Sequence, residues 1–277
     1  MEVISLKKIE RIVVAFFSPH GNTQKVANQI AFYFSEKLSV PITFDNFTLP
    51  QNRKTERHFS ENDFVIFASP TYAGKLPNKI LPDMKLLFKA NATPTLALVT
   101  FGNRAFDNSL AELNSVLTEN GFTVLGALAF ASKHAFAEIG NAHPTANDEQ
   151  VRIDICDAVL EKLQNDTLSP AQNITGDAAA PYYTPLQLSG EPAKFLKAKP
   201  LTDELKCDHC GVCASLCPTG AISHENESDV PGICIKCQSC VTHCHTGAKS
   251  FVDEQFLSHR AMLERDYKRL AESKAFV

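Results

Sequence analysis

The chain has 277 residues, of which 44% are hydrophobic and 21% charged, a composition typical of a folded globular protein and not of a disordered one. Its formal net charge of -4 argues against nucleic-acid binding as the main role, because proteins with that role usually carry an excess of basic residues. The length favours two domains over one.

Neither a membrane span nor a secretion signal is predicted. The longest apolar runs, such as residues 12–17, are far shorter than the ~20 residues that a spanning helix needs. The first ten residues, MEVISLKKIE, lack the charged, then apolar, then small order of a signal peptide. We therefore expect a cytoplasmic protein.

Residues 1–165 alternate between strand and helix patterns. Four unbroken apolar runs are typical of strands buried on both faces, and they lie at 12–17, 64–69, 95–101 and 122–130. A weaker, more polar run at 41–47 is typical of an edge strand. Apolar residues recur at helical spacing over 27–38, 106–117 and 147–163, and Thr145 and Asp148 form a candidate capping pair. The helix between the third and fourth strands is the least regular, because Pro77 and Pro82 interrupt it. The pattern predicts an α/β domain with a doubly wound five-stranded parallel sheet, with Cys156 as a small core residue.

A loop suited to an anion follows the first strand. Small hydroxyl residues and a glycine stand directly before a helix, so backbone N–H groups can converge on an anion there. The candidate binding residues are Ser18, His20, Gly21, Asn22 and Thr23. Neither the Walker pattern nor the G-x-G-x-x-G pattern is present, and the loop alone is equally compatible with an ordinary capped turn.

Two further loops follow the third and fourth strands. The carboxyl ends of parallel strands face one crevice in a doubly wound sheet, so we expect these loops to border the same crevice as the first. Their candidate residues are Pro70, Thr71, Tyr72, Ala73, Gly74, Phe101, Gly102, Asn103 and Arg104. The alternatives are a merely packed aromatic for Tyr72 and turn or surface residues for Asn103 and Arg104. His134, just after the fifth strand, is read as a solvated or capping histidine.

The regular pattern stops at residues 166–200. Five prolines and two glycines predict a stiff, irregular connector and hence a domain boundary. Residues 201–252 form the next unit, and residues 253–277 are predicted to form a last helix whose apolar face packs on a neighbouring domain.

Eight of the nine cysteines lie between Cys207 and Cys244, in two copies of C-x2-C-x2-C-x3-C. Two-residue gaps let three thiolates converge on one iron–sulfur cluster, while the fourth cysteine of each motif ligates the other cluster. The spacing therefore predicts two [4Fe-4S] clusters, one held by Cys207, Cys210, Cys213 and Cys244, the other by Cys234, Cys237, Cys240 and Cys217. Structural zinc and disulfides are the weaker alternatives, because zinc sites favour paired cysteines and the cytoplasm keeps thiols reduced.

The surroundings of these motifs add two expectations. His209, His243 and His245 are read as surface side chains, with a role beside the clusters as the alternative. Residues 201–254 hold eight acidic and three basic residues, a net of -5, which suits docking onto a basic redox partner as well as it suits solubility alone. A core this small predicts that cluster assembly supplies the folding energy.

The doubled cysteine motif resembles that of the bacterial two-cluster ferredoxins, although His245 stands where a proline follows the other fourth cysteine. Together with FFSPHGNT, SPTYAGKLP and TFGNRAFDNSL, it makes the whole chain similar to flavodoxin–ferredoxin fusion proteins. The resemblance implies a flavodoxin-like domain that binds FMN, the first loop taking its phosphate and the other two flanking its ring. It also implies a small α+β ferredoxin domain.

These features favour an electron-transfer protein that relays electrons between FMN and two [4Fe-4S] clusters in an anaerobic or reducing cytoplasm. Its expected partner is a redox protein, namely a ferredoxin, a reductase or another oxidoreductase, and the sequence is also compatible with a homodimer. No residue has the setting of a general acid, base or nucleophile. The alternatives are a flavin-dependent reductase of a small molecule fed by the clusters, and a redox-sensing binding module.

Overall fold

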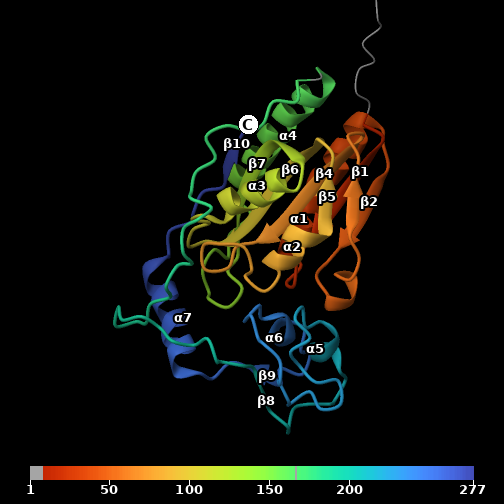
Figure 1. The fold of residues 1–277 in the computed structure, drawn as a ribbon. Coiled ribbons are helices and arrows are strands. Elements are labelled where there is room, and N and C mark those ends of the chain that lie inside the picture. The colour runs from red at the N-terminus through yellow and green to blue at the C-terminus, as the bar shows by residue number, and fades with distance from the viewer. Residues whose placement is uncertain (1–8, 166) are drawn as a thin grey trace, which may run out of the picture.

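A mainly parallel six-stranded sheet is the centre of the larger domain, with five strands from the N-terminal part of the chain and one from its C-terminal end (Figure 1). The computed structural model describes residues 9–165 and 167–277, so the signal-peptide prediction falls on residues that are almost all outside the described part, as does the first residue of the connector, at position 166. The strand order is β10-β7-β6-β4-β1-β2. Its large strands are β1 (Arg11–Phe16), β2 (Ile42–Asn46), β4 (Asp63–Pro70), β6 (Thr93–Gly102) and β7 (Phe122–Ser132).

These five strands run parallel and are the five that the sequence predicts. Counted by themselves, they follow the order 2-1-3-4-5 of the flavodoxin-like doubly wound fold. The predicted fold class is therefore confirmed. Two short strands that were not predicted, β3 (Arg57–Phe59) and β5 (Phe88–Ala90), form a separate parallel pair.

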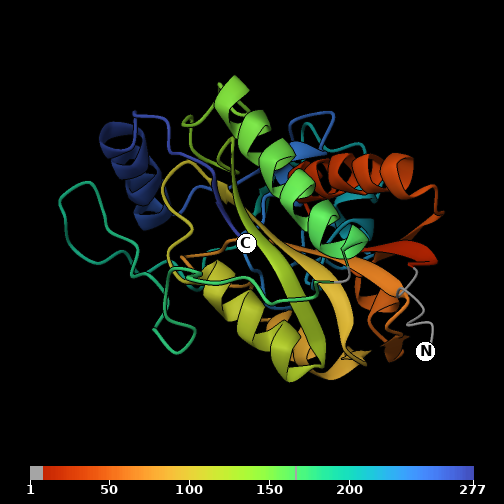
Figure 2. The ribbon, with the colours of Figure 1, turned by 90° about the horizontal axis from the view of Figure 1, so that it is seen from above.

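Helices cover both faces of the sheet, as the view from above shows (Figure 2). One face packs against α1 (Asn22–Leu38) and α4 (Ala146–Gln164), which bury Phe34 and Val159 among others. The other face packs against α2 (Leu81–Leu87) and α3 (Ser109–Glu119). Because both faces are covered, the central strands can be apolar throughout, which explains their unbroken apolar runs.

Local features of the helices also match the sequence. Thr145 and Asp148 form the predicted capping box at the start of α4, and Cys156 is fully buried in the core, where burial raises its pKa to about 12. The doubtful helix forms only seven residues, with Pro82 in its first turn, where a missing N–H costs nothing. None of the helices in the described residues is long and apolar enough to cross a membrane.

The connector is irregular, as predicted, but it is tied to the sheet domain. Lys75 Nζ donates to the carbonyl oxygens of Ala178 and Ala180 at 2.5 and 2.9 Å. Tyr182 donates its hydroxyl to the carbonyl oxygen of Leu76 at 2.7 Å. Residues 178–182 of the connector therefore lie against the loop after β4, while Leu188 and Lys194 bond side chains of the C-terminal segment at Ser258 and Gln255.

The cysteine module, residues 201–252, lies beyond the carboxyl edge of the sheet, where the loops after β1, β4 and β6 also lie (Figure 1). It contains the two-residue strands β8 (Leu201–Thr202) and β9 (Lys249–Ser250), which pair antiparallel, and the one-turn helices α5 (Val212–Ser215) and α6 (Ser239–Thr242). Its own apolar cluster is small, centred on Ala214, Ile222 and Cys240.

The C-terminal segment corrects the predicted helix over 253–277. Helix α7 (Glu254–Asp266) ends earlier, and residues 274–276 form β10 (Lys274–Phe276), which pairs antiparallel with β7. The physical reason is Asn103, whose side-chain amide donates to the carbonyl oxygens of Tyr267 and Arg269 and accepts from the amide of Ala271. These bonds take backbone groups that a continuing helix would need.

Candidate iron–sulfur and flavin sites

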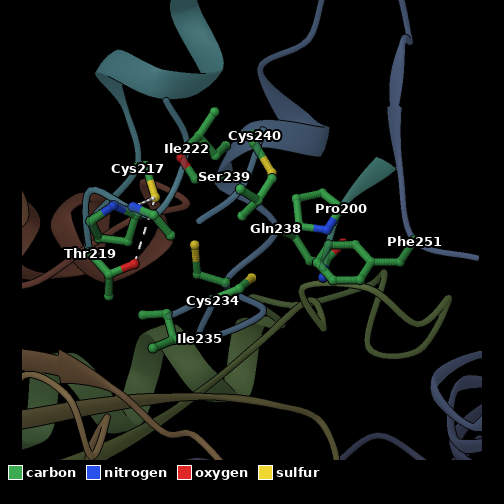
Figure 3. Close-up of a pocket in the computed structure, with 14 residues that line it drawn as sticks. Pro200, Cys217, Thr219, Ile222, Cys234, Ile235, Gln238, Ser239, Cys240 and Phe251 are labelled. Carbon is green, nitrogen blue, oxygen red and sulfur yellow. Dashed lines mark hydrogen bonds between the residues drawn. The ribbon is translucent and has the colours of Figure 1, made fainter. Parts of the chain in front are cut away.

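Two hollows in the cysteine module are each lined by four cysteines. The first is lined by Cys217, Cys234, Cys237 and Cys240, and Figure 3 labels Cys217, Cys234 and Cys240 around it. The second is lined by Cys207, Cys210, Cys213 and Cys244. We call these the proximal set and the distal set, because only the first lies beside the sheet domain. Each is one of the two sets that the spacing predicts, with the fourth cysteine crossing over.

The two motifs have matching backbone turns. His209 and Lys236 both take φ 57°, and the next equivalent positions, Gly211 and Gln238, take φ 71° and 65°. These left-handed residues curl the chain so that the cysteines between them can turn to one point. The match continues to Gly220 and Gly247, each three residues after the fourth cysteine of its motif.

Hydrogen-bond donors surround the sulfur atoms. The amide of Ala221 donates to Cys217 Sγ at 3.2 Å, and that of Lys236 to Cys234 Sγ at 3.4 Å. Burial raises the pKa of Cys240 to about 12 and also that of Cys237, so thiolates at these positions need a positive partner. Four cysteines, amides aimed at sulfur and an apolar wall are a donor set that fits an iron–sulfur cluster.

Three of the four histidines of the module, those next to cysteines, lie near its surface. His245 Nε2 is 2.9 Å from an oxygen of Asp208, and both side chains are exposed. His209 Nδ1 is 3.3 Å from Glu227 Oε2. His243 contacts the carbonyl oxygen of Ser239 on its own short helix. All three are exposed, in agreement with the expectation of surface side chains.

The loop after β1 leaves the start of α1 without a side chain at its cap position. That position is Gly21, with φ 86°, and the Ser18 hydroxyl accepts from the amide of Gln24 instead. Thr23 is buried, with its hydroxyl 2.6 Å from that of Thr100. His20 and Asn22 complete the loop, with Asn22 exposed. A helix start with an uncapped glycine is a donor set that fits a phosphate.

The loop after β4 reaches from the sheet toward the cysteine module. Pro70, Thr71 and Tyr72 are half-buried, and the fields of Cys237 and Cys234, after burial itself, raise the pKa of Tyr72 well above its usual value. Ala73 is exposed. Gly74 has φ 75°, and a Cβ there would lie 2.3 Å from an oxygen of Asp107, so packing within the chain already requires a glycine.

The side chains of the loop after β6 contact other parts of the same chain. Asn103 is buried and binds the segment 267–271, as described above, while Phe101 is a core residue. A Cβ at Gly102 would lie 2.6 Å from the His134 ring. Arg104 stacks over the Tyr183 ring at 4.0 Å and pairs with Asp107. The side chains of this loop are therefore engaged within the protein.

His134 closes the turn that follows β7 by capping backbone amides of that turn, although no helix of the described residues begins there. Its Nδ1 accepts from the amides of Phe136 and Ala137 at 3.3 and 3.2 Å. Burial is the main cause of a pKa lowered to about 3, with His259 and Arg104 adding to it. The ring therefore stays neutral at pH 7.

Three contacts join the proximal side of the cysteine module to the sheet domain, and we call them the seam. Arg53 Nη2 donates to the carbonyl oxygen of Pro218 at 2.7 Å. His20 Nε2 lies 2.8 Å from the hydroxyl of Thr242. Ile235 packs against the apolar core between the sheet and helices α2 and α3. Burial, His243 and Lys133 lower the pKa of His20.

Sequence reasoning missed Arg53, which joins the cysteine module to the sheet domain, and Lys75, which ties the connector to that domain. Arg53 also bonds the carbonyl oxygens of Phe47 and Thr48, and Lys75 forms a buried ion pair with Glu112 at 3.1 Å. Both look like ordinary surface cations in the sequence. Only the position of Lys75 in the loop after the third strand was a signal that it lies near the site.

Comparison with known proteins supports the iron–sulfur prediction. The family model of the 4Fe-4S binding domain matches residues 200–223, which contain the first motif. A search of curated proteins returned no match. Iron–sulfur chemistry is thus confirmed at the family level, while the second motif lies outside the matched range.

Several flavodoxin structures are similar to the N-terminal part. A flavodoxin of Streptococcus pneumoniae is 18% identical, with 55% of this chain and 98% of that chain covered and a TM-score of 0.38. Flavodoxin 2 of Bacillus cereus is 15% identical, with 55% and 99% covered and a TM-score of 0.40. A Fusobacterium nucleatum flavodoxin bound to flavin mononucleotide is 14% identical, with 56% and 98% covered and a TM-score of 0.37. These identities and TM-scores are low, and the flavodoxin-like fold follows from the strand order of the sheet.

A flavodoxin-like sheet followed by a 4Fe-4S binding domain fits a flavodoxin–ferredoxin fusion. Both parts are of kinds that serve electron transfer, which supports a redox role for the chain.

Proposed function

We propose that the protein is an electron carrier that holds two [4Fe-4S] clusters and one FMN in a single chain and relays electrons between them. In such a protein the clusters supply one-electron transfer at low potential and the flavin takes up one or two electrons. The proposal includes a flavin-binding domain at 1–165, a connector at 166–200, a cluster domain at 201–252 and a C-terminal segment at 253–277. Within that last segment the helix ends at Asp266. So does a reducing cytoplasm as the place of action.

The observation that carries the proposal is the pair of cysteine hollows. Each is lined by a complete set of four cysteines, and each set combines three cysteines of one motif with the last cysteine of the other. Structural zinc sites favour two C-x2-C pairs over the triplet spacing found here, and a disulfide would need paired sulfur atoms. The structure has nine free cysteines, none of them paired.

The flavin part of the proposal rests on the first two loops. Residues Ser18 to Thr23 would hold the phosphate through backbone amides at the start of α1, and Tyr72 would lie against the ring. Because the side chains of Asn103 and Arg104 are engaged within the chain, we expect only backbone contacts from the third loop. The half-buried Tyr72 is close enough to the proximal set for Cys237 and Cys234 to affect its pKa.

The seam explains why one chain would carry both kinds of cofactor. Arg53, His20 and Ile235 keep the proximal set beside the loops that would bind the flavin, so exchange between them needs no diffusional encounter. The external partner would be a redox protein such as a ferredoxin, a reductase or another oxidoreductase.

Anaerobic purification with iron, sulfide and flavin analysis tests the proposal. We expect about eight irons and about one FMN per chain, with the visible absorption of both chromophores. Zinc in place of iron, together with an absence of flavin, would falsify it.

A substitution in the first loop tests the flavin site separately from the clusters. Gly21→Val should remove the flavin and leave the iron content unchanged, because a β-branched residue is strained at φ 86° and would distort the helix start. The matched control is Gly190→Val in the connector, where φ is 90° and the added Cβ likewise meets nothing within 4 Å. Full flavin content in the Gly21 variant would rule out this loop as the phosphate site.

A further inference from the structure

The two cysteine sets differ in their access to solvent. In the proximal set Cys240 is buried, and Cys234 and Cys237 are only partly accessible, on the side of the module where the seam lies. In the distal set Cys210 is exposed. An electron must reach an outside protein over a short distance, so the distal set is the one that an incoming protein can approach.

Acidic side chains lie beside the exposed set, and two of them, Asp208 and Glu227, line its hollow. The turn 223–229 carries Glu225, Glu227 and Asp229, and it is joined to the first motif because Glu227 contacts His209 and Ser228 donates to a carboxylate oxygen of Glu204. Asp208 lies between the first two cysteines and is exposed. We call this surface, made of Glu204, Asp208, Cys210, Glu225 and Asp229, the distal face.

The three lysines of the module do not offset this charge. Lys249 is buried and donates to the Thr202 hydroxyl at 2.7 Å and to the carbonyl oxygen of Glu227. Lys236 is turned toward the connector, where it donates to the carbonyl oxygen of Leu196. Lys206 is paired with Asp203 at 2.8 Å. The distal face is therefore negative at neutral pH.

An apolar side chain stands close in sequence to this face. Leu205 is 99% exposed, two residues before Cys207, and its amide is held by the Asp203 carboxylate at 3.1 Å. A fully exposed leucine on a fixed turn offers apolar surface that a partner can cover, beside charges that orient its approach.

We propose that the distal face is the docking surface for a redox protein whose own electron-transfer site is ringed by lysine and arginine side chains. The inference rests on the proposed function, and it adds the side of the molecule that a partner uses and the charge of that partner. Each encounter transfers one electron between the two proteins, so that one is oxidised as the other is reduced, and no proton or chemical group is exchanged. The flavin loops, lying at the seam, take no part in docking.

Cytochrome c, a basic haem protein, is a suitable probe of this surface. The full-length protein with its cofactors is mixed with it, and zero-length carbodiimide coupling followed by peptide mapping shows which carboxylates lie against its lysines. We expect cross-links at Glu204, Glu225 or Asp229. Cross-links confined to the sheet domain would overturn the proposal, and this readout does not depend on electron transfer.

Charge-neutralising variants give the quantitative test. The protein is first reduced with dithionite, and the second-order rate constant for its electron transfer to cytochrome c is measured at low ionic strength. The triple variant Glu204→Gln, Glu225→Gln, Asp229→Asn should lower this rate constant about fivefold to tenfold and make it less sensitive to salt. The matched control neutralises three exposed acids at the opposite edge of the sheet, Glu10→Gln, Glu36→Gln and Glu161→Gln. It changes the net charge equally and should leave the rate within about twofold.

Cofactor analysis separates the two proposals. If both variants hold iron and flavin like the natural protein and react with cytochrome c equally fast, docking at the distal face is excluded while the relay stands. If the natural protein holds no clusters, the proposed function itself fails. A third variant, Leu205→Ser, should weaken cross-linking without changing the salt dependence, because it removes apolar contact and no charge.

Discussion

Gln238 takes a backbone conformation that its counterpart Gly211 adopts without strain. Its φ is 65°, in the left-handed region, where a residue with a Cβ loses roughly 1–2 kcal/mol. The side chain is buried and donates to the carbonyl oxygen of Lys236 at 3.1 Å, which offsets part of this cost. The second motif thus keeps the turn that its cysteines need even without a glycine.

His134 gives the sheet domain a pH dependence of definite sign. Burial and its neighbours hold its pKa at about 3, against an ordinary value of 6.5. Below about pH 6.5 the His134 imidazole becomes protonated in the unfolded chain but stays neutral in the folded protein. Its contribution to the free energy of unfolding is therefore fully present above that pH and is lost as the pH falls toward 3. We expect His134→Gln to lose less stability between pH 7 and pH 5 than the natural protein does.

Urea unfolding followed by circular dichroism measures this difference. The control is His58→Gln, which removes an imidazole whose side chain is 73% exposed. Identical pH slopes for His134→Gln and the natural protein would show that the buried ring does not govern the acid response.

Single residues also mark the limit of what the sequence could predict. The cysteines carry their role in their spacing, and the capping box of α4 is readable from Thr145 and Asp148 alone. Asn103 has no such signature, because its partners at Tyr267, Arg269 and Ala271 are more than 160 positions away along the chain. A loop position beside a candidate crevice fits a ligand contact and a structural tie equally well in a sequence.

At the level of elements, the central strands and long helices were predictable because each has one dominant period or an unbroken apolar run. The short elements were not. Strands β3, β5 and β10 have three residues each, too few to show alternation, and β10 forms because β7 offers it a free edge. Helix α7 was predicted too long because Tyr267 and Leu270 continue its apolar spacing past the point where Asn103 stops it.

The crossed arrangement of the two cysteine motifs can be tested with paired substitutions. Cys217→Ser with Cys237→Ser removes two ligands of the proximal set and should leave about four irons per chain. Cys213→Ser with Cys217→Ser changes two cysteines of the same motif but one ligand in each set. The iron content of both clusters should therefore fall. Iron and sulfide analysis with electron paramagnetic resonance of the reduced protein measures the outcome. Equal cluster content in the two variants would contradict the crossed sets.

For the whole molecule, Arg53 is the clearest link between the two parts. Arg53→Ala should increase amide hydrogen exchange about tenfold in residues 217–221, because a lost hydrogen bond of this kind is worth about 1–1.5 kcal/mol. Arg57→Ala is a matched control. Arg57 also pairs with an aspartate and is about equally buried, but its bonds go to Asp45, Asn52 and Thr55 of the sheet domain, whereas Arg53 also reaches Pro218. Unchanged exchange in the Arg53 variant would mean that the seam is held by other contacts.

The return of the chain to the sheet at β10 has a consequence for biosynthesis. This strand leaves the ribosome after all eight motif cysteines, so the growing chain cannot close the β7 edge until the cysteine module has been made. An open edge is where partly made proteins pair wrongly. Timely delivery of iron and sulfide to the module should thus also protect the sheet, and iron starvation should increase aggregation of newly made chains.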